Sequence, residues 1–135
     1  MSRYLLFDLD GTLTESGEGI IRSVQYALEK MGKPETDVQK LRSFIGPPLI
    51  PQFMSFSGMT REEAGQAVQF YRERYSTTGV FENRPYPGIP EMLQTLTDRG
   101  YVLSVASSKP EHYVRQILEH FGLTPFFHEI VGATM

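Results

Sequence analysis

The chain contains no cysteine, no block of consecutive lysine or arginine residues, and no apolar segment of membrane-spanning length. The absence of cysteine excludes disulfides and thiolate-bound metals, and it fits a reducing compartment. With a formal net charge of −3, the sequence gives no electrostatic reason to expect nucleic acid or an anionic membrane surface as a partner. The apolar stretch at residues 4–7 is too short for a signal peptide. We therefore expect a soluble cytoplasmic protein.

The order of apolar patterns predicts an α/β fold. Residues 4–7 form a short continuous apolar run, which is typical of a buried strand. In the second half of the chain, helical patterns alternate with the strand-like stretches "YVLSVA" and "FHEIV". Such alternation indicates a parallel sheet joined by right-handed crossovers. We predict that residues 1–13 and 82–135 form one α/β domain.

The intervening residues, 14–81, are predicted to form an inserted helical domain. A helical period begins at Ser16 and ends at Gly32, and shorter helices are expected over residues 35–44 and 49–56. Between these short helices, the stretch "IGPPL" must be a loop, because proline does not fit a helix interior. The stretch "TREE" has the spacing of a capping box and predicts the start of a last long helix.

Two acids, Asp8 and Asp10, follow the first predicted strand directly. Ligands of open α/β sheets bind beyond the carboxyl ends of the strands, and strand alternation would point both side chains to the same side. Two like charges become stable there if a hard divalent cation lies between them and a phosphate, which describes Mg²⁺. One carboxylate can then attack phosphorus, and the other can transfer the protons.

Acids at this spacing also occur in proteins where they have no catalytic role. An isolated pair of this kind is most often a solvated turn or a helix cap. A calcium-binding EF-hand loop also begins with two acids at this spacing, but Leu13 stands where that loop needs glycine and Gly19 where it needs glutamate. The combination of "FDLDGTL" after one strand with "SVASSKP" after another favours a catalytic site.

These two stretches resemble the motifs of the haloacid dehalogenase-like (HAD) superfamily, and the sequence is similar to its phosphoglycolate phosphatase-type members. The resemblance implies a Rossmann-like three-layer parallel-sheet core with an inserted α-helical cap. It also implies that Asp8 is the nucleophile and Asp10 the general acid/base, that both contribute to an Mg²⁺ site, and that Ser107 holds the transferring phosphoryl group. The further residues that it assigns to phosphate binding are Gly11, Thr12, Ser108 and Lys109.

By the same resemblance, residues 14–81 are the cap that closes over the site, and the loop containing Gly46 and Pro47 determines specificity. The implied function is an Mg²⁺-dependent phosphatase that acts on a small phosphomonoester, such as phosphoglycolate, through an aspartyl-phosphate intermediate. A 5′-nucleotidase of the same family and a non-catalytic metal- or phosphate-binding fragment remain as alternatives. A non-enzymatic receiver domain is disfavoured, because receivers place the acceptor aspartate on a later strand and "EIVGATM" contains none.

In the family, a further strand, a third-motif lysine and an acidic fourth motif lie beyond a segment like "EIVGATM". We therefore expect the 135 residues to be a fragment that is inactive by itself. Its first strand would have a bare outer edge, without the lysine, proline or bulge that usually protects an edge. We expect such a chain to self-associate through this edge or to remain a loosely packed monomer.

Overall fold

The computed structural model describes residues 3–134, which divide into two compact units. The first unit contains the described residues up to Glu15 and from Arg84 onward, and the second contains Ser16–Asn83. Both junctions lie two residues later in the chain than the sequence patterns predict. Among residues 3–134, no helix is long and apolar enough to span a membrane.

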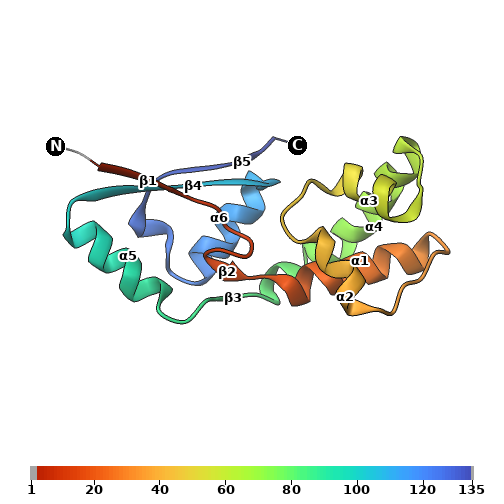
Figure 1. Cartoon of the computed structure of the whole chain (residues 1–135), viewed down its shortest axis with the longest axis horizontal. Coiled ribbons are helices and arrows are strands. Elements are labelled where there is room, and N and C mark those ends of the chain that lie inside the picture. Colours follow the sequence, from red (N-terminus) through yellow and green to blue (C-terminus); the bar gives the residue numbers. More distant parts are fainter. Residues whose placement is uncertain (1–2, 135) are drawn as a thin grey trace. The chain divides into compact units, whose positions relative to one another are not determined.

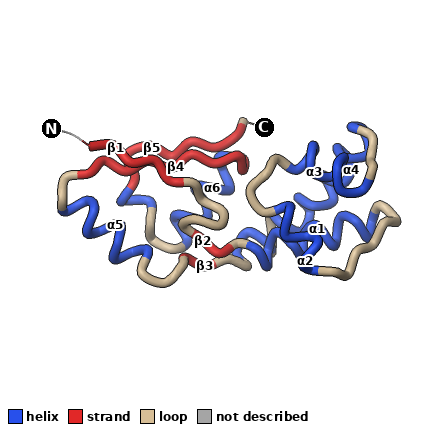
Figure 2. The backbone as a smooth tube through the Cα atoms, viewed as in Figure 1, coloured by secondary structure: helices blue, strands red, loops and turns tan. Residues whose placement is uncertain are grey.

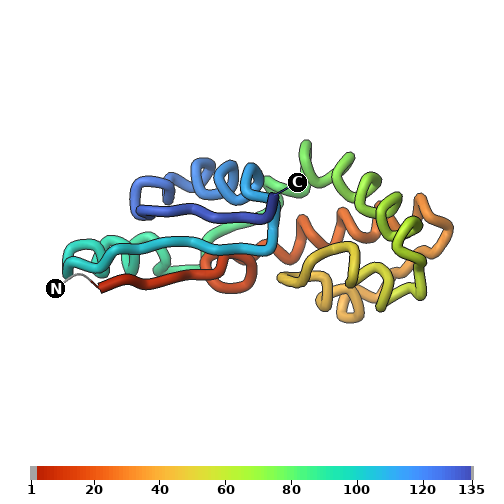
Figure 3. Tube along the Cα trace, turned by 90° about the horizontal axis from the view of Figure 1, so that it is seen from above, coloured from red at the N-terminus to blue at the C-terminus, as the bar shows by residue number. Residues whose placement is uncertain are grey.

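The first unit is built on a parallel sheet. Its strands are β1 (Arg3–Phe7), β4 (Tyr101–Pro110) and β5 (Phe127–Ala133), in the order β1-β4-β5. Both neighbouring pairs are parallel, and Phe7 of β1 pairs with Val105 of β4. Figures 1 and 3 show the three strands side by side, with β4 in the middle. The predicted α/β class with a parallel sheet is therefore confirmed.

Helices α5 (Ile89–Asp98) and α6 (Glu111–His120) lie on one face of this sheet (Figure 1). The side chains between them and the strands form the core of the unit, and the fully buried ones include Leu93, Leu103, Val105, Val114 and Leu118. On the strands, Tyr4, Leu6 and Val131 are 74%, 71% and 51% exposed. The described part of this unit therefore contains two of the three layers expected from the resemblance.

A short antiparallel ladder in the first unit is absent from the sequence prediction. Strand β2 (Thr14–Glu15) pairs with β3 (Arg84–Pro85) (Figure 2), and the side chains of Glu15 and Arg84 form an ion pair at 3.0 Å. The predicted helical domain beginning at residue 14 is wrong at this point, because residues 14 and 15 are a strand. Two-residue strands have no periodicity from which they could be predicted.

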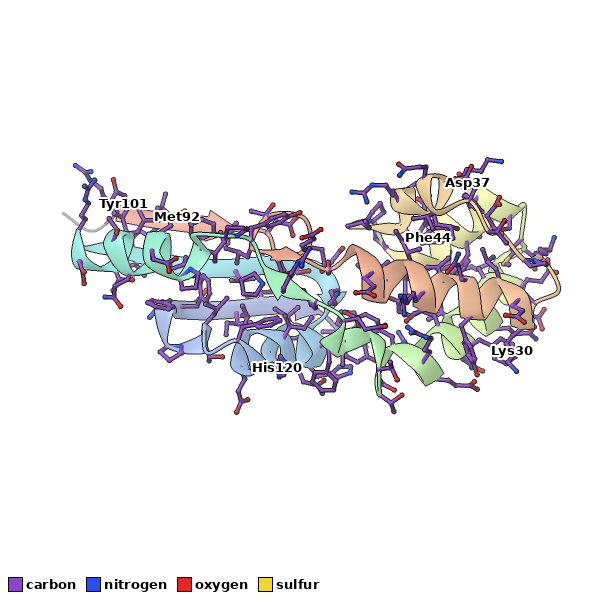
Figure 4. The ribbon with its side chains drawn as sticks, turned by 90° about the horizontal axis from the view of Figure 1, so that it is seen from below. Lys30, Asp37, Phe44, Met92, Tyr101 and His120 are labelled. Carbon is purple, nitrogen blue, oxygen red and sulfur yellow. The ribbon has the colours of Figure 1, made fainter. Side chains whose placement is uncertain are left out.

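The second unit is helical, as predicted. It consists of α1 (Gly17–Lys30), α2 (Val38–Leu41), the 3-10 helix η1 (Arg42–Phe44), α3 (Leu49–Ser57), α4 (Arg61–Tyr75) and the 3-10 helix η2 (Gly79–Phe81). The single helix predicted over residues 35–44 begins later than expected, because Asp37 caps α2 at its start. It also continues as the 3-10 helix η1 after Leu41. Phe44 packs against Phe53 and Phe56 and is labelled in Figure 4.

Two local features of the second unit follow directly from its sequence. The predicted capping box at Thr60 is confirmed, since Thr60 and Glu63 exchange both side-chain-to-backbone hydrogen bonds. Gly19 and Gly79 allow two backbones to touch, because a Cβ on Gly19 would lie 2.0 Å from the Gly79 carbonyl oxygen. Larger residues would therefore push α1 away from η2.

Candidate active site

The loop after β1 is a tight turn closed by backbone hydrogen bonds. The carbonyl oxygen of Leu9 accepts the N–H groups of Thr12, Leu13 and Thr14 at 3.2, 2.9 and 3.1 Å. Gly11, with a φ of 80°, allows the chain to reverse, and its N–H donates to the Thr14 carbonyl at 2.9 Å. The sequence "DLDGT" therefore folds into a compact loop that fixes the backbone of both acids.

The two acids of this loop have different environments. Asp8 is exposed, and its Oδ1 accepts the N–H of Leu9 at 2.8 Å. Asp10 is only 9% exposed, and its Oδ1 accepts a hydrogen bond from Lys109 Nζ at 2.9 Å. Since β1 ends at Phe7, the turn rather than strand alternation sets the direction of these side chains. The expectation based on alternation therefore does not apply here.

The last residues of β4 supply the second group of predicted residues. They form an irregular stretch in which the pairing with β5 shifts register between Ala106 and Pro110, and residues 107–109 of this stretch are called the Lys109 loop. Ser107 is partly buried, Ser108 is exposed and Lys109 is buried. Within this loop the backbone N–H of Lys109 donates to Ser107 Oγ at 3.1 Å. Because β1 and β4 are parallel neighbours and Phe7 pairs with Val105, the turn after β1 and the Lys109 loop of β4 meet at one edge of the sheet.

Strand β5 holds the Lys109 loop from the other side. The backbone N–H of Gly132 donates to Glu111 Oε1 at 3.3 Å, and Arg115 Nε contacts the other carboxylate oxygen of Glu111 at 3.2 Å. A Cβ on Gly132 would lie 2.7 Å from the Lys109 carbonyl oxygen. The absence of a side chain at residue 132 is thus what lets β5 approach this loop.

The charge of Lys109 is buried together with its partner. Burial lowers the pKa of the Lys109 ammonium below its usual value, and the charge and hydrogen bond of Asp10 counteract part of that effect. A buried charge of this kind is costly unless an opposite charge and hydrogen bonds compensate for it. The Lys109–Asp10 ion pair therefore couples the turn after β1 to the Lys109 loop.

The two acids fit a magnesium ion. Among residues 3–134, no group of three or more histidine, cysteine, aspartate or glutamate side chains could hold a metal. Mg²⁺ is commonly held by only one or two carboxylates, together with waters and the phosphate of a substrate. Asp8 and Asp10 are the residues of the first unit that would hold such an ion, through oxygen donors alone.

The structure brings together four of the predicted site residues at the ends of β1 and β4: Asp8, Asp10, Ser107 and Lys109. Gly11 and Thr12 are exposed on the turn between Asp10 and β2. Gly46 and Pro47 belong to the second unit, where Gly46 adopts a φ of 102° between η1 and α3. The sequence patterns did not predict the Asp10–Lys109 contact or the role of Gly132, since both depend on residues far apart in the chain.

Comparison with protein families matches residues 5–135 to the haloacid dehalogenase-like hydrolase model. A 5′-nucleotidase of Pseudomonas aeruginosa is 49% identical over 131 residues, covering 97% of this chain and 59% of that protein. The tyrosine-protein kinase PtkA of Mycobacterium tuberculosis is 38% identical over 130 residues, covering 96% and 44%. A phosphoglycolate phosphatase of Haemophilus influenzae is 32% identical over 135 residues, covering 93% and 60%.

Among solved structures, a predicted phosphatase from Clostridium acetobutylicum superimposes with a TM-score of 0.95 at 46% identity, covering 98% of this chain and 61% of that one. The chain thus spans about 59% of the length of the P. aeruginosa relative. The family match extends over both units described above and includes both acidic residues and the Ser107–Lys109 loop. The chain belongs to the haloacid dehalogenase-like hydrolase family.

Proposed function

We propose that this protein is an Mg²⁺-dependent phosphatase that hydrolyses a small phosphomonoester through an aspartyl-phosphate on Asp8. The observation that carries the proposal is the meeting of two loops at one edge of a parallel sheet. One loop holds Asp8 and Asp10, the other holds Ser107 and Lys109, and Lys109 Nζ lies 2.9 Å from Asp10 Oδ1.

In the first step, a carboxylate oxygen of Asp8 attacks phosphorus, and the bond between phosphorus and the leaving-group oxygen breaks. Asp10 gives its proton to that oxygen, so the alcohol leaves neutral. In the second step, Asp10 takes a proton from water, the water oxygen attacks phosphorus, and the bond to Asp8 breaks. Inorganic phosphate is released and both carboxyl groups return to their starting state.

The exposure of the two acids supports this division of roles. Asp8 is exposed, as a nucleophile must be to meet a substrate that arrives from solvent. Asp10 is only 9% exposed and receives Lys109 Nζ at 2.9 Å, so its carboxyl group has a fixed position from which to transfer protons. Ser107 would hold a phosphoryl oxygen, whereas the backbone N–H groups of Gly11 and Thr12 are already bound within the turn. Mg²⁺ bound at the acids would neutralise the charge of the phosphate.

Substrate choice is assigned to the second unit, acting as a cap with the Gly46–Pro47 loop as its specificity element. Relatives named 5′-nucleotidase and phosphoglycolate phosphatase support a small phosphorylated metabolite as the substrate class, and a 5′-nucleotide is the alternative to phosphoglycolate. We retain a cytoplasmic location as part of the proposal. Neither nucleic acid nor membrane is expected as a partner, because the net charge is −3 and the sequence has no basic block.

The exposed edge strand supports a further proposal about association. Strand β1 ends the described sheet at one side, and Tyr4 and Leu6 are 74% and 71% exposed. Apart from Arg3 at its start, this strand is apolar, and an apolar edge favours pairing with another strand. The 135-residue chain is therefore expected to self-associate through β1.

The phosphatase proposal is tested with the Asp8→Asn and Asp10→Asn variants of the full-length protein, assayed for phosphate release with Mg²⁺ present. Asp8→Asn is expected to abolish turnover, because an amide is a poor nucleophile toward phosphorus. Asp10→Asn is expected to lower kcat by about 10²–10⁴-fold, the usual contribution of one acid/base group. A near-normal rate for Asp8→Asn would refute the assignment.

A further inference from the structure

The Lys109–Asp10 ion pair joins residues that are 99 positions apart, with side chains that are 7% and 6% exposed. Exposed ion pairs contribute little to stability, and buried pairs often do no better than apolar residues of the same size, because both charges must lose their hydration. Removing one partner alone is costly, because a buried charge is left uncompensated. The pair therefore calls for a role beyond stabilising the fold.

The side chain of Lys109 extends from a loop that is held on several sides. Its own N–H is bound to Ser107 Oγ at 3.1 Å, and Gly132 of β5 packs against its carbonyl oxygen. The next helix is tied to the same strand, since Glu111 accepts the N–H of Gly132 and Arg115 donates to the Ile130 carbonyl at 3.2 Å. A cation presented from such a loop has a fixed position relative to the sheet.

Asp10 is held at the other end of the contact. Its backbone lies in the turn closed on the Leu9 carbonyl, and its Oδ1 receives Lys109 Nζ at 2.9 Å. A carboxylate held by its backbone and by a charge-assisted hydrogen bond has little freedom to rotate. A phosphate that enters from solvent would meet the exposed Asp8 before a lysine that is 8% exposed.

We propose that Lys109 is a positioning residue that orients the Asp10 carboxylate and does not bind phosphate directly. The inference rests on the proposed function, in which Asp10 transfers the protons. It differs from the sequence-based expectation, which placed Lys109 among the phosphate ligands. Displacing a reacting group by about 1 Å can lower a rate by about 10²-fold, which sets the effect expected when Lys109 is removed.

The test compares Lys109→Met, Lys109→Arg, Asp10→Asn and the double variant Lys109→Met/Asp10→Asn in the full-length protein. The readouts are kcat and KM for an aryl phosphate and the inhibition constant of inorganic phosphate. Lys40→Met is the matched control, because Lys40 is 63% exposed and pairs with Glu35 on the surface at 3.9 Å.

Lys109→Met is expected to lower kcat by about 10²-fold while KM and the inhibition constant of phosphate stay near their wild-type values. Lys109→Arg, which keeps the charge and the donors, is expected to restore part of the rate. In the Asp10→Asn background, Lys109→Met should lower kcat little further, because Lys109 acts on the reaction through Asp10. A rise of about tenfold in the phosphate inhibition constant, or a further large loss in the double variant, would overturn the proposal.

The same variants separate this inference from the proposed function. If the wild-type protein releases no phosphate, the proposed function fails, and urea unfolding of the four variants still tests the pair. The two single changes are expected to destabilise the protein by more, in sum, than the double variant does, because the double variant leaves no buried unpaired charge. Additive effects on unfolding would contradict the coupling on which the positioning role depends.

Discussion

Gly132→Ala probes the packing that holds the Lys109 loop against β5. The added Cβ would lie 2.4 Å from Glu111 Cα, 2.6 Å from Glu111 N and 2.7 Å from the Lys109 carbonyl oxygen. These are backbone atoms, which cannot move aside as a flexible side chain can. Carbon atoms pack at about 3.5–4.0 Å, so β5 and the start of α6 must separate by about 1 Å. Overpacking of this kind costs about 1–3 kcal/mol.

Urea unfolding followed by far-ultraviolet circular dichroism measures the loss, and hydrogen exchange in α6 locates it. Gly65→Ala is the matched control, since Gly65 lies in α4 and a Cβ there meets nothing within 4 Å. Replacing glycine by alanine inside a helix stabilises by about 0.5–1 kcal/mol. The two changes should therefore have opposite signs. A Gly132→Ala protein as stable as the wild type would refute the packing argument.

Three further changes test other parts of the structure. Thr60→Ala removes the cap of α4 and should lower the free energy of unfolding by about 1 kcal/mol, as measured by urea unfolding; no change would mean that the capping box contributes nothing. Replacing Pro47 and Pro48 with glycine should alter the ranking of a panel of phosphorylated metabolites more than the hydrolysis of an aryl phosphate, and an unchanged ranking would make this loop merely structural. Leu6→Lys places a charge on the exposed edge strand and should reduce self-association of the 135-residue chain in light scattering, whereas unchanged association would assign it to another surface.

The sequence predicted the elements whose side chains follow a clear period. The strands of the parallel sheet and the long helices α1, α4, α5 and α6 were predicted from apolar spacing and from the residues that begin or end them. The predicted burial of residues 4–7 is wrong, because Tyr4 and Leu6 are 74% and 71% exposed on a strand at the side of the described sheet. The β2–β3 ladder was missed because it contains two residues on each side. Strand β4 continues to Pro110, beyond the predicted "YVLSVA", because pairing with β5 extends it there.

For the candidate site, the sequence predicted which residues gather but not how they contact one another. Asp8 and Asp10 were identified from their position after a strand, a rule that depends only on sheet topology. Ser107 and Lys109 were assigned to phosphate through the resemblance to the family's motifs. Its contact with Asp10 arises from the parallel pairing of β1 and β4, and its fixed position arises from the close approach of Gly132. Neither contact leaves a local pattern in the sequence.

The central claim is that a phosphoryl group passes through Asp8, and trapping that group tests it most directly. The full-length protein is incubated with a phosphomonoester and Mg²⁺, reduced with borohydride, which converts an aspartyl-phosphate into homoserine, and digested for mass spectrometry. We expect homoserine at residue 8 only when substrate is present, and none in the Asp8→Asn variant. Phosphate release without homoserine at residue 8, or a phosphoryl group on a different side chain, would contradict the proposed mechanism.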